Sequence, residues 1–309
     1  MSEFTWRDGE RLIRFGPLGP IEEPFLLLTT ERAALPELTA AATEVAYVPA
    51  GKVDEISAEL LERHSFAPDV LLVALGGGRV VDTTKAIAGA VGARCGAIPT
   101  TLSGAEMTPF HRTPVGVAGA RLVRPALVLA DPELMASAPP QTLAASAMNA
   151  LAHAMEALYT PLANPVASMA ALRAASLLAG EEREALALGA LLAGYASGST
   201  GIAVHHAICQ TIVRTAGTPH AETNAVMLPH SARLMEPRAP EALRAFRNAV
   251  GTDLAALAAR SGQTRLSSLG VSEQQLPGIA EAVAAHPLAA NTPDPPGSEE
   301  LLALLREAL

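Results

Sequence analysis

The chain has 309 residues, of which 50% are hydrophobic and only 3% aromatic, and its formal net charge is −9. This length suits two domains or one large one, with a core built mostly from small aliphatic side chains. The acidic balance and the lack of a block of basic residues argue against nucleic acid and anionic membranes as partners.

The first half of the chain alternates predicted strands with predicted helices. Its polar, acidic start is not a signal peptide, and no apolar run in the chain is long enough for a membrane span, so we expect a cytoplasmic protein. Strands that alternate with helices imply an α/β domain with a parallel sheet and helices on both faces. We predict a strand or hairpin within 1–23, strands at 24–30, 44–49, 70–75, 94–98 and 126–130, helices at 31–42, 53–64 and 80–91, and a hairpin from 115–117 and 121–123.

Three consecutive glycines, Gly76, Gly77 and Gly78, separate the predicted strand at 70–75 from the next helix. Glycines allow positive φ and leave no Cβ in the way of a ligand. The unpaired N–H groups and the dipole at the start of a helix favour an anion such as a pyrophosphate. The pattern is not the G-x-G-x-x-G fingerprint, and a plain connection is the alternative. We interpret the stretch as a phosphate-binding turn.

After Pro139-Pro140 no further strand is predicted. The proline pair therefore predicts a boundary between an α/β dinucleotide-binding domain, residues 1–138, and an all-α domain, residues 139–309. The helices expected in the second domain lie at about 141–159, 165–179, 181–197, 199–215, 222–235, 239–250, 252–261, 272–285 and 298–309.

Histidines are concentrated in this helical half. Asn149 and His153 are four residues apart on one predicted helix, His205 and His206 are adjacent on another, and His220 begins a turn. One histidine on an apolar helix is usually a core residue, whereas several buried imidazoles need partners, which a common site supplies. Imidazoles serve as metal ligands, proton donors or anion binders, and an amide is a poor ligand for a hard cation.

A metal site would be stronger with a carboxylate beside the histidines, which Glu156 or Glu222 could supply. We interpret Glu156 instead as a charge on a helix surface and Glu222 as a residue at a helix N-terminus. Cys95 and Cys209 lack metal-type spacing in apolar surroundings, so we expect buried free thiols, which fit a reducing compartment.

Six segments of the chain, given below, occur in the same order as in the iron-containing alcohol dehydrogenase superfamily and resemble it. This superfamily shares its fold with dehydroquinate synthase. The likeness is strongest to maleylacetate reductases, with which the chain shares Glu106-Met107-Thr108-Pro109, Asn149, the His205-His206 pair and the run from His220 to Thr223. The matching segments are GGGRVVDTTKAIA (76–88), AIPTTLSGAEMT (97–108), LADPELM (129–135), NALAHAMEALY (149–159), HHAIC (205–209) and PHAETNAVMLPH (219–230).

The resemblance implies an oxidoreductase that uses NADH or NADPH and reduces maleylacetate to 3-oxoadipate in aromatic-compound degradation. It implies that Gly76–Gly78 hold the pyrophosphate and that Asp82 and Lys85 lie near the nicotinamide ribose. Thr100, Thr101 and Ser103 are expected to line the nucleotide cleft.

The resemblance also assigns the helical half. The Asp and three His that hold iron or zinc in metal-using members fall at Asn149, His153, His206 and His220, and the Asn implies that no metal is used. The catalytic residues expected are His206, His220, His153 and Gln210.

A dianionic or carbonyl substrate would contact Asn149, His205 and Arg112, and Lys85 and the imidazoles would add positive charge. Gln210 stands where the family has a further histidine, four residues after His206. Because glutamine cannot donate a proton as an acid, His206 or His220 must do so.

Two alternatives are open. One is a metal-dependent alcohol or aldehyde dehydrogenase, against which Asn149 argues. The other is a divergent non-redox enzyme or non-catalytic nucleotide-binding member, favoured by Arg79 in place of a serine, by Gln210 and by a shortening between about Ser176 and Glu184. Relatives are commonly dimers, so we expect a homodimer in which residues 1–23 join a sheet edge. The choice between NADH and NADPH is open.

Overall fold

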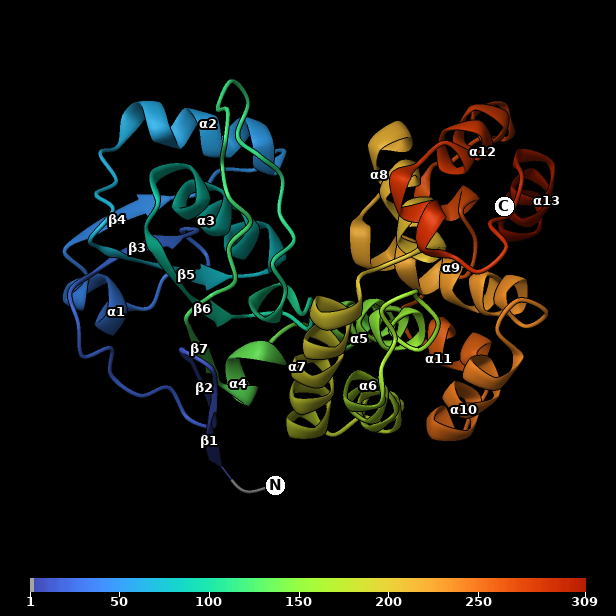
Figure 1. Cartoon of the computed structure of the whole chain (residues 1–309), viewed down its shortest axis with the longest axis horizontal. Helices are drawn as coiled ribbons and strands as arrows, with labels where there is room; N and C mark the ends of the chain where they lie inside the picture. The colour runs from blue at the N-terminus through green and yellow to red at the C-terminus, as the bar shows by residue number, and fades with distance from the viewer. Residues whose placement is uncertain (1–2) are drawn as a thin grey trace. The chain divides into compact units, whose positions relative to one another are not determined.

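The sheet of the N-terminal unit positions the first candidate site. In the computed structural model, which describes residues 3–309, seven strands form one sheet in the order β1-β2-β7-β6-β5-β3-β4 (Figure 1). Only the β1–β2 pair is antiparallel among these neighbours. The strands are β1 Phe4–Asp8, β2 Arg11–Phe15, β3 Phe25–Thr29, β4 Glu44–Tyr47, β5 Leu71–Gly76, β6 Arg94–Pro99 and β7 Leu127–Ala130.

Strand β5 is an interior strand of the sheet, between β3 and β6. Every residue of β5 is buried, which explains its uninterrupted apolar sequence, because helices cover both faces of a parallel sheet. From β3 the chain moves outward to β4, whereas from β5 it moves the other way, through β6 to β7. The carboxyl ends of β3 and β5 therefore form a switch point, where open α/β sheets bind their ligands.

The helices of this unit cover the sheet from two sides. Helices α2 and α3 pack on one face through Ile56, Leu60 and Ile87, and helices α1 and α4 pack on the other through Leu38 and Leu134 (Figure 1). These elements are α1 Pro36–Ala41, α2 Val53–Arg63, α3 Gly78–Val91, α4 Pro132–Met135 and the 3-10 turn η1 Ala105–Met107.

Two local predictions for this unit need correction. The helix predicted at 31–42 begins only at Pro36, because proline suits the first helical turn and the preceding residue is extended. The hairpin predicted from 115–117 and 121–123 is wrong: the backbone N–H groups of Val115 and Arg121 bond to the carbonyls of Asp54 and Gly89 instead. A Cβ at Gly89 would lie 2.1 Å from the Arg121 carbonyl oxygen, so the helix needs glycine there.

The second compact unit begins at Ala138, one residue from the predicted boundary. The predicted fold class is confirmed, since the described residues after Ala138 form helices and no strand. The helices are α5 Pro140–Glu156, α6 Pro165–Leu178, α7 Arg183–Thr200, α8 Val204–Ala216, α9 His220–Met235, α10 Pro240–Val250, α11 Leu254–Ala259, α12 Leu276–Ala284 and α13 Ser298–Ala308, with 3-10 turns η2 Ser267–Leu269, η3 Glu273–Gln275 and η4 Pro287–Asn291.

Helix α5 is the core helix of this unit and packs against α6, α7 and α9. Its residues from Ala145 to Glu156 are all buried, so any polar side chain there needs an internal partner. Both cysteines are buried free thiols as predicted, and burial raises the pKa of Cys95 to about 12. Within residues 3–309 no single helix is long and apolar enough to cross a membrane. Helices α7 and α8 together reach that length and apolar character, but the pair is bent by 103°.

Candidate functional site

The glycine turn does not use the positive φ that glycine allows. Gly77, the N-cap of α3, has φ −74° and ψ −179°, and neither Gly76 nor Gly78 has a positive φ. Space explains the glycines instead: a Cβ at Gly77 would lie 3.0 Å from Thr101 Cγ2, and one at Gly78 would lie 3.1 Å from Ser103 Cβ. The turn after β5 and the loop after β6 thus approach each other too closely for side chains.

The start of α3 offers donors to an anion. Within the described residues no side chain caps this helix, although the Gly77 carbonyl accepts from the N–H groups of Val80 and Val81. Thr101 Oγ1 is buried and has no hydrogen-bond partner among the described residues. Uncapped N–H groups, the helix dipole and an unused hydroxyl suit a phosphate. The residues present therefore fit the pyrophosphate of a dinucleotide.

Lys85 is placed differently from the expectation. Its side chain is fully buried, and Nζ donates to the carbonyls of Ala105 (2.9 Å), Thr108 (3.2 Å) and Phe110 (2.6 Å). Asp82, which is about one-third exposed, completes the set with an ion pair of 2.7 Å. An ammonium has three donors, and all are used within the protein. Lys85 therefore fixes the loop after β6, and Asp82 is its counter-ion.

A buried carboxylate that the sequence did not single out for chemistry lies in that loop. Glu106 is fully buried, and neither of its oxygens has a hydrogen-bond partner in the described chain. Burial raises its pKa to about 7, and the charge of Lys85 opposes that rise.

The second group of candidate residues lies inside the helical unit. His153 on α5 and His206 on α8 stack with ring centroids 4.2 Å apart and an interplanar angle of 20°. His205 meets the edge of the His206 ring at 5.2 Å. Burial lowers the pKa of all three rings, to about 3 for His206 and about 4 for His205, so they are neutral at neutral pH.

Glu156 is not the surface charge that the sequence predicted. It is fully buried at the end of α5, and its Oε1 accepts from the backbone N–H groups of His205 (2.7 Å) and His206 (3.3 Å). Its Oε2 lies 2.6 Å from Nδ1 of His206. Burial raises the pKa of Glu156, while the backbone donors and neighbouring imidazoles oppose that rise. A carboxylate at this place caps the start of α8 and holds one of its rings.

His205, expected to bind substrate, is fully buried and bonded on both sides. Its Nδ1 lies 2.9 Å from Ser231 Oγ, and its Nε2 lies 2.9 Å from Asn224 Oδ1. Asn224 in turn donates from Nδ2 to the carbonyl of His220. The side chain therefore links α8 to the start of α9 and has no atom left for a substrate.

The other predicted residues keep at least one polar atom for further contacts or lie at the surface. Asn149 Oδ1, His153 Nδ1 and His206 Nε2 are buried without partners in the described residues. Gln210 on α8 is partly exposed, and His220 at the first turn of α9 is exposed. Arg112 is exposed on the loop of the α/β unit, where Thr100 and Ser103 are partly exposed.

A bound metal ion does not suit this donor set. Within the described chain no group of three or more His, Cys, Asp or Glu side chains is arranged to hold a metal. The rings of His153 and His206 stack face to face, and the nearby carboxylate of Glu156 is already bonded to α8. Asn149 supplies only a neutral amide oxygen, a weak ligand for iron or zinc.

The sequence missed Glu156, Asn224 and Ser231 as parts of this cluster. For Glu156 a signal existed, because it lies three residues after His153 on an apolar helix and so shares its face. No comparable pattern marked Asn224 or Ser231, which follow from how α8 and α9 pack.

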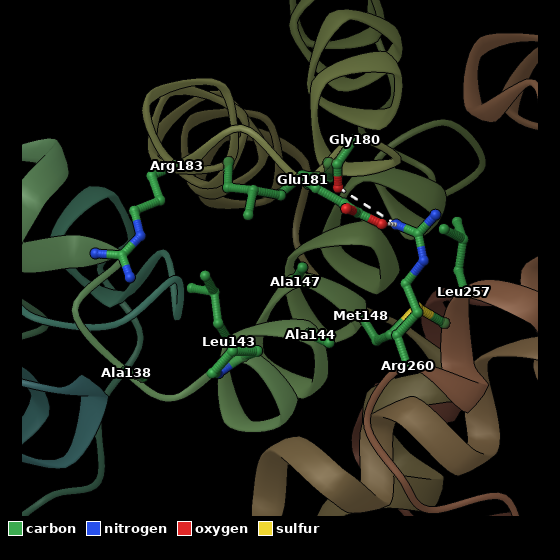
Figure 2. A pocket seen from close by; sticks show the side chains of 13 residues that line it. Ala138, Leu143, Ala144, Ala147, Met148, Gly180, Glu181, Arg183, Leu257 and Arg260 are labelled. Atoms are coloured by element: carbon green, nitrogen blue, oxygen red, sulfur yellow. Dashed lines mark hydrogen bonds and ion pairs between the residues drawn. The ribbon is translucent and has the colours of Figure 1, made fainter.

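A separate cavity of about 340 Å³ lies in the helical unit and contains none of the clustered histidines (Figure 2). It is lined by α5, by α11 and by the short connection between α6 and α7. At its rim Arg260 donates to the Gly180 carbonyl and pairs with Glu181 at 3.5 Å (Figure 2). These are exposed contacts of modest strength.

A parallel sheet with an uncapped glycine turn beside its switch point defines a dinucleotide-binding protein. Comparison with known proteins gives the family. Residues 29–139 match the iron-containing alcohol dehydrogenase family, and residues 143–309 match the C-terminal part of the Fe-containing alcohol dehydrogenase family. The chain therefore belongs to the iron-containing alcohol dehydrogenase family.

Several curated relatives are maleylacetate reductases. Maleylacetate reductase 1 of Rhodococcus opacus is 37% identical over 227 residues, which are 66% of this chain and 64% of that protein, a little under two thirds of its length. The enzyme of Rhizobium sp. strain MTP-10005 is 36% identical over 255 residues, 75% of this chain and 72% of that protein.

Solved structures agree with these sequence matches. The crystal structure of the Rhizobium maleylacetate reductase superposes with a TM-score of 0.80 at 32% identity, covering 93% of this chain and 89% of that one. An iron-containing alcohol dehydrogenase from Corynebacterium glutamicum superposes with a TM-score of 0.79 at 28% identity, covering 93% and 88%.

Proposed function

We propose that the protein is an NAD(P)H-dependent reductase of the maleylacetate reductase type. The substrate would be a dianionic 2-enoate with a 4-oxo group, reduced at its C=C bond to the saturated oxo acid. The observation that carries the proposal is the His153–His206 stack, with unpartnered polar atoms on both rings and on Asn149, in a chain whose relatives are maleylacetate reductases.

The cofactor would be held by the α/β unit. The N–H groups at the start of α3 and the hydroxyl groups of Thr101 and Ser103 would contact the pyrophosphate beside Gly77 and Gly78. When bound, the reduced nicotinamide supplies the hydride for one carbon of the double bond. The protein must then deliver a proton to the other carbon.

His206 is the proton donor that this arrangement favours. Gln210 occupies the family's usual histidine position and cannot act as an acid. His206 Nε2 has no partner within the described residues, so it is available to a substrate. Burial lowers the pKa of this ring to about 3, which makes its protonated form a strong acid, and the negative charges of a bound dianion would raise that pKa. His220 is the second candidate, because it begins α9 and is exposed.

We propose that the reaction proceeds without a metal ion. The neutral amide of Asn149 and the stacked imidazoles support this, because a catalytic divalent cation favours a charged ligand and converging lone pairs. The substrate's carboxylates would instead be bound by imidazoles of the helical unit. The metal-dependent dehydrogenase is the alternative that this donor set disfavours.

We also propose a homodimer formed through the N-terminal hairpin. Strand β1 is an edge of the sheet and pairs on one side only among the described residues, with β2. An open edge strand is a template for another strand, and a second copy of this chain supplies one. Light scattering at micromolar concentration should give twice the chain mass, and the monomer mass would contradict this proposal.

The activity is tested by following absorbance of the reduced nicotinamide with maleylacetate. We expect wild type to oxidise NADH or NADPH, and we expect Gln210→His to be neutral or more active. A wild type that is silent with both cofactors would overturn the reductase proposal. That result would favour the divergent non-redox reading, which Gln210 and Arg79 support.

A further inference from the structure

We infer that Glu156 is a positioning residue for His206. It holds the ring with its resting proton on Nδ1 and leaves Nε2 as the one ring atom that exchanges a proton with a ligand. The reaction step in this inference rests on the function proposed above, whereas the state of the ring does not.

The contacts of Glu156 favour its ionised form as an acceptor. Two backbone N–H groups, of His205 and His206, point at Oε1, so this oxygen acts as an acceptor. Oε2 lies 2.6 Å from His206 Nδ1, the short distance of a charge-assisted hydrogen bond. The carboxylate sits at the first turn of α8, where the helix dipole favours negative charge. An ionised Glu156 therefore accepts at both oxygens, with Nδ1 of His206 as the donor to Oε2.

The neighbouring rings prevent His206 from turning over. His153 covers one face of the ring at 4.2 Å, and His205 contacts it at 5.2 Å in an edge-to-face arrangement. A flip would remove Nδ1 from Glu156 and place a C–H group against its carboxylate. A fully buried carboxylate that loses such a donor is strongly destabilised. The orientation of His206 is thus over-determined by its surroundings.

The adjacent ring of His205 has the opposite proton position. Asn224 donates its amide to the His220 carbonyl, so its Oδ1 must accept from His205 Nε2. A neutral His205 is then without a proton on Nδ1, which lies 2.9 Å from Ser231 Oγ, a hydroxyl that is also 3.0 Å from the Met227 carbonyl. Two neighbouring histidines on α8 are therefore held as opposite tautomers, and His205 serves as an internal reference for His206.

The fixed position of the ring proton gives the proton transfer one direction, through Nε2. The proton that reaches the substrate carbon leaves from Nε2 of a protonated His206, and the ring is left neutral with its proton on Nδ1. Water reloads Nε2 for the next turnover. Glu156 compensates the charge of the protonated ring and keeps Nδ1 from exchanging, as an aspartate does for the histidine of a catalytic triad.

The tautomer is measured directly by long-range ¹H–¹⁵N NMR on protein labelled at histidine nitrogen. His206→Ala identifies the signals of His206 among those of the eight histidines. In wild type we expect a protonated Nδ1 and a bare Nε2 for His206, and the reverse for His205. A wild-type spectrum with the His206 proton on Nε2 overturns the inference, whatever the variants do.

Glu156→Gln tests the cause. A glutamine must turn its oxygen to the two backbone N–H groups, so its NH₂ faces Nδ1 and the ring proton moves to Nε2. An unchanged His206 tautomer in a folded Glu156→Gln protein also contradicts the inference. Glu241→Gln, on the exposed face of α10, is the matched control and should leave both tautomers as in wild type.

Turnover provides the second readout. Glu156→Gln should lower kcat by about a hundredfold with little change in KM, the scale of a misplaced general acid. In a His206→Ala background, Glu156→Gln should lower kcat almost no further, because the ring through which Glu156 acts is already absent. A full additional loss there would show that Glu156 acts on the fold alone. A wild type without nicotinamide oxidation would refute the proposed function and leave the tautomer result standing.

Discussion

The rings of His153 and His206 lie parallel, with centroids 4.2 Å apart, although the residues belong to different helices. Each ring lies where a positive charge on the other is unfavourable, and the charge of His206 further lowers the pKa of His153. A protonated ring in one position therefore disfavours protonation of the other, and the pair resists carrying two protons at once. A single transferable proton is what one hydride transfer requires.

The first prediction concerns metal. Purified wild type should hold no stoichiometric iron or zinc by elemental analysis. Asn149→Asp should bind these ions more tightly, because it places a charged oxygen four residues before His153. Asn248→Asp on the exposed surface of α10 adds the same charge elsewhere and should bind no better than wild type. One tightly bound metal per wild-type chain would refute the prediction.

The second prediction concerns the cofactor. Gly77→Val should abolish nicotinamide nucleotide binding, because the added side chain enters the space between the turn and Thr101, where a Cβ alone is 3.0 Å from Cγ2. The backbone of Gly77 is accessible to any residue, so the fold should survive. Gly278→Val, at an open position on α12, is the control for β-branching in a helix. Fluorescence titration with unchanged affinity in Gly77→Val would show that the phosphates bind elsewhere.

The third prediction concerns stability and pH. The folded-state pKa of Glu106 is raised from 4.5 to about 7, so folding favours the protonated acid. The contribution of Glu106 to the free energy of unfolding is therefore fully present below pH 4.5 and is lost as the pH rises towards 7. The loss is on the order of 3 kcal/mol, at about 1.4 kcal/mol per pKa unit.

Glu106→Gln should remove this dependence and leave the variant more stable than wild type at pH 8. Urea unfolding at several pH values measures it, with the exposed Glu10→Gln as control. Parallel stability profiles for wild type and Glu106→Gln would contradict the assignment.

The fourth prediction concerns proton delivery. His206→Ala should reduce kcat by about a hundredfold or more, the typical contribution of general acid catalysis. His220→Ala tests the second candidate in the same assay. If neither variant loses turnover while wild type is active, the proton must come from another group. An equal loss in both would indicate that the two imidazoles share the task.

The fold could be predicted from the sequence where local patterns determine the secondary structure. The buried apolar run of β5 and the proline or asparagine that begins a helix, as at Pro165 after Asn164, place elements within a few residues. The segment from 115 to 123 was misread because its backbone bonds to α2 and α3, a long-range partner that no local pattern reveals.

Less of the candidate site could be predicted from the sequence. Gly77 and His206 stand out by residue type, whereas the roles of Lys85 and Glu156 depend on which atoms surround them. A lysine near a phosphate turn suggests a ligand contact, and only its complete burial shows that it bonds to carbonyls instead. Burial of a charge is a tertiary property, so the sequence alone could not supply it.

The buried ammonium of Lys85 also has a meaning for protein engineering. Because one side chain joins the carbonyls of Ala105, Thr108 and Phe110, the loop that carries Thr101 and Ser103 has its shape set from inside the molecule. Redesign of cofactor preference by exchanging residues along that loop will succeed only while this tether is kept. Lys85 is thus better treated as part of the backbone scaffold than as a position open to variation.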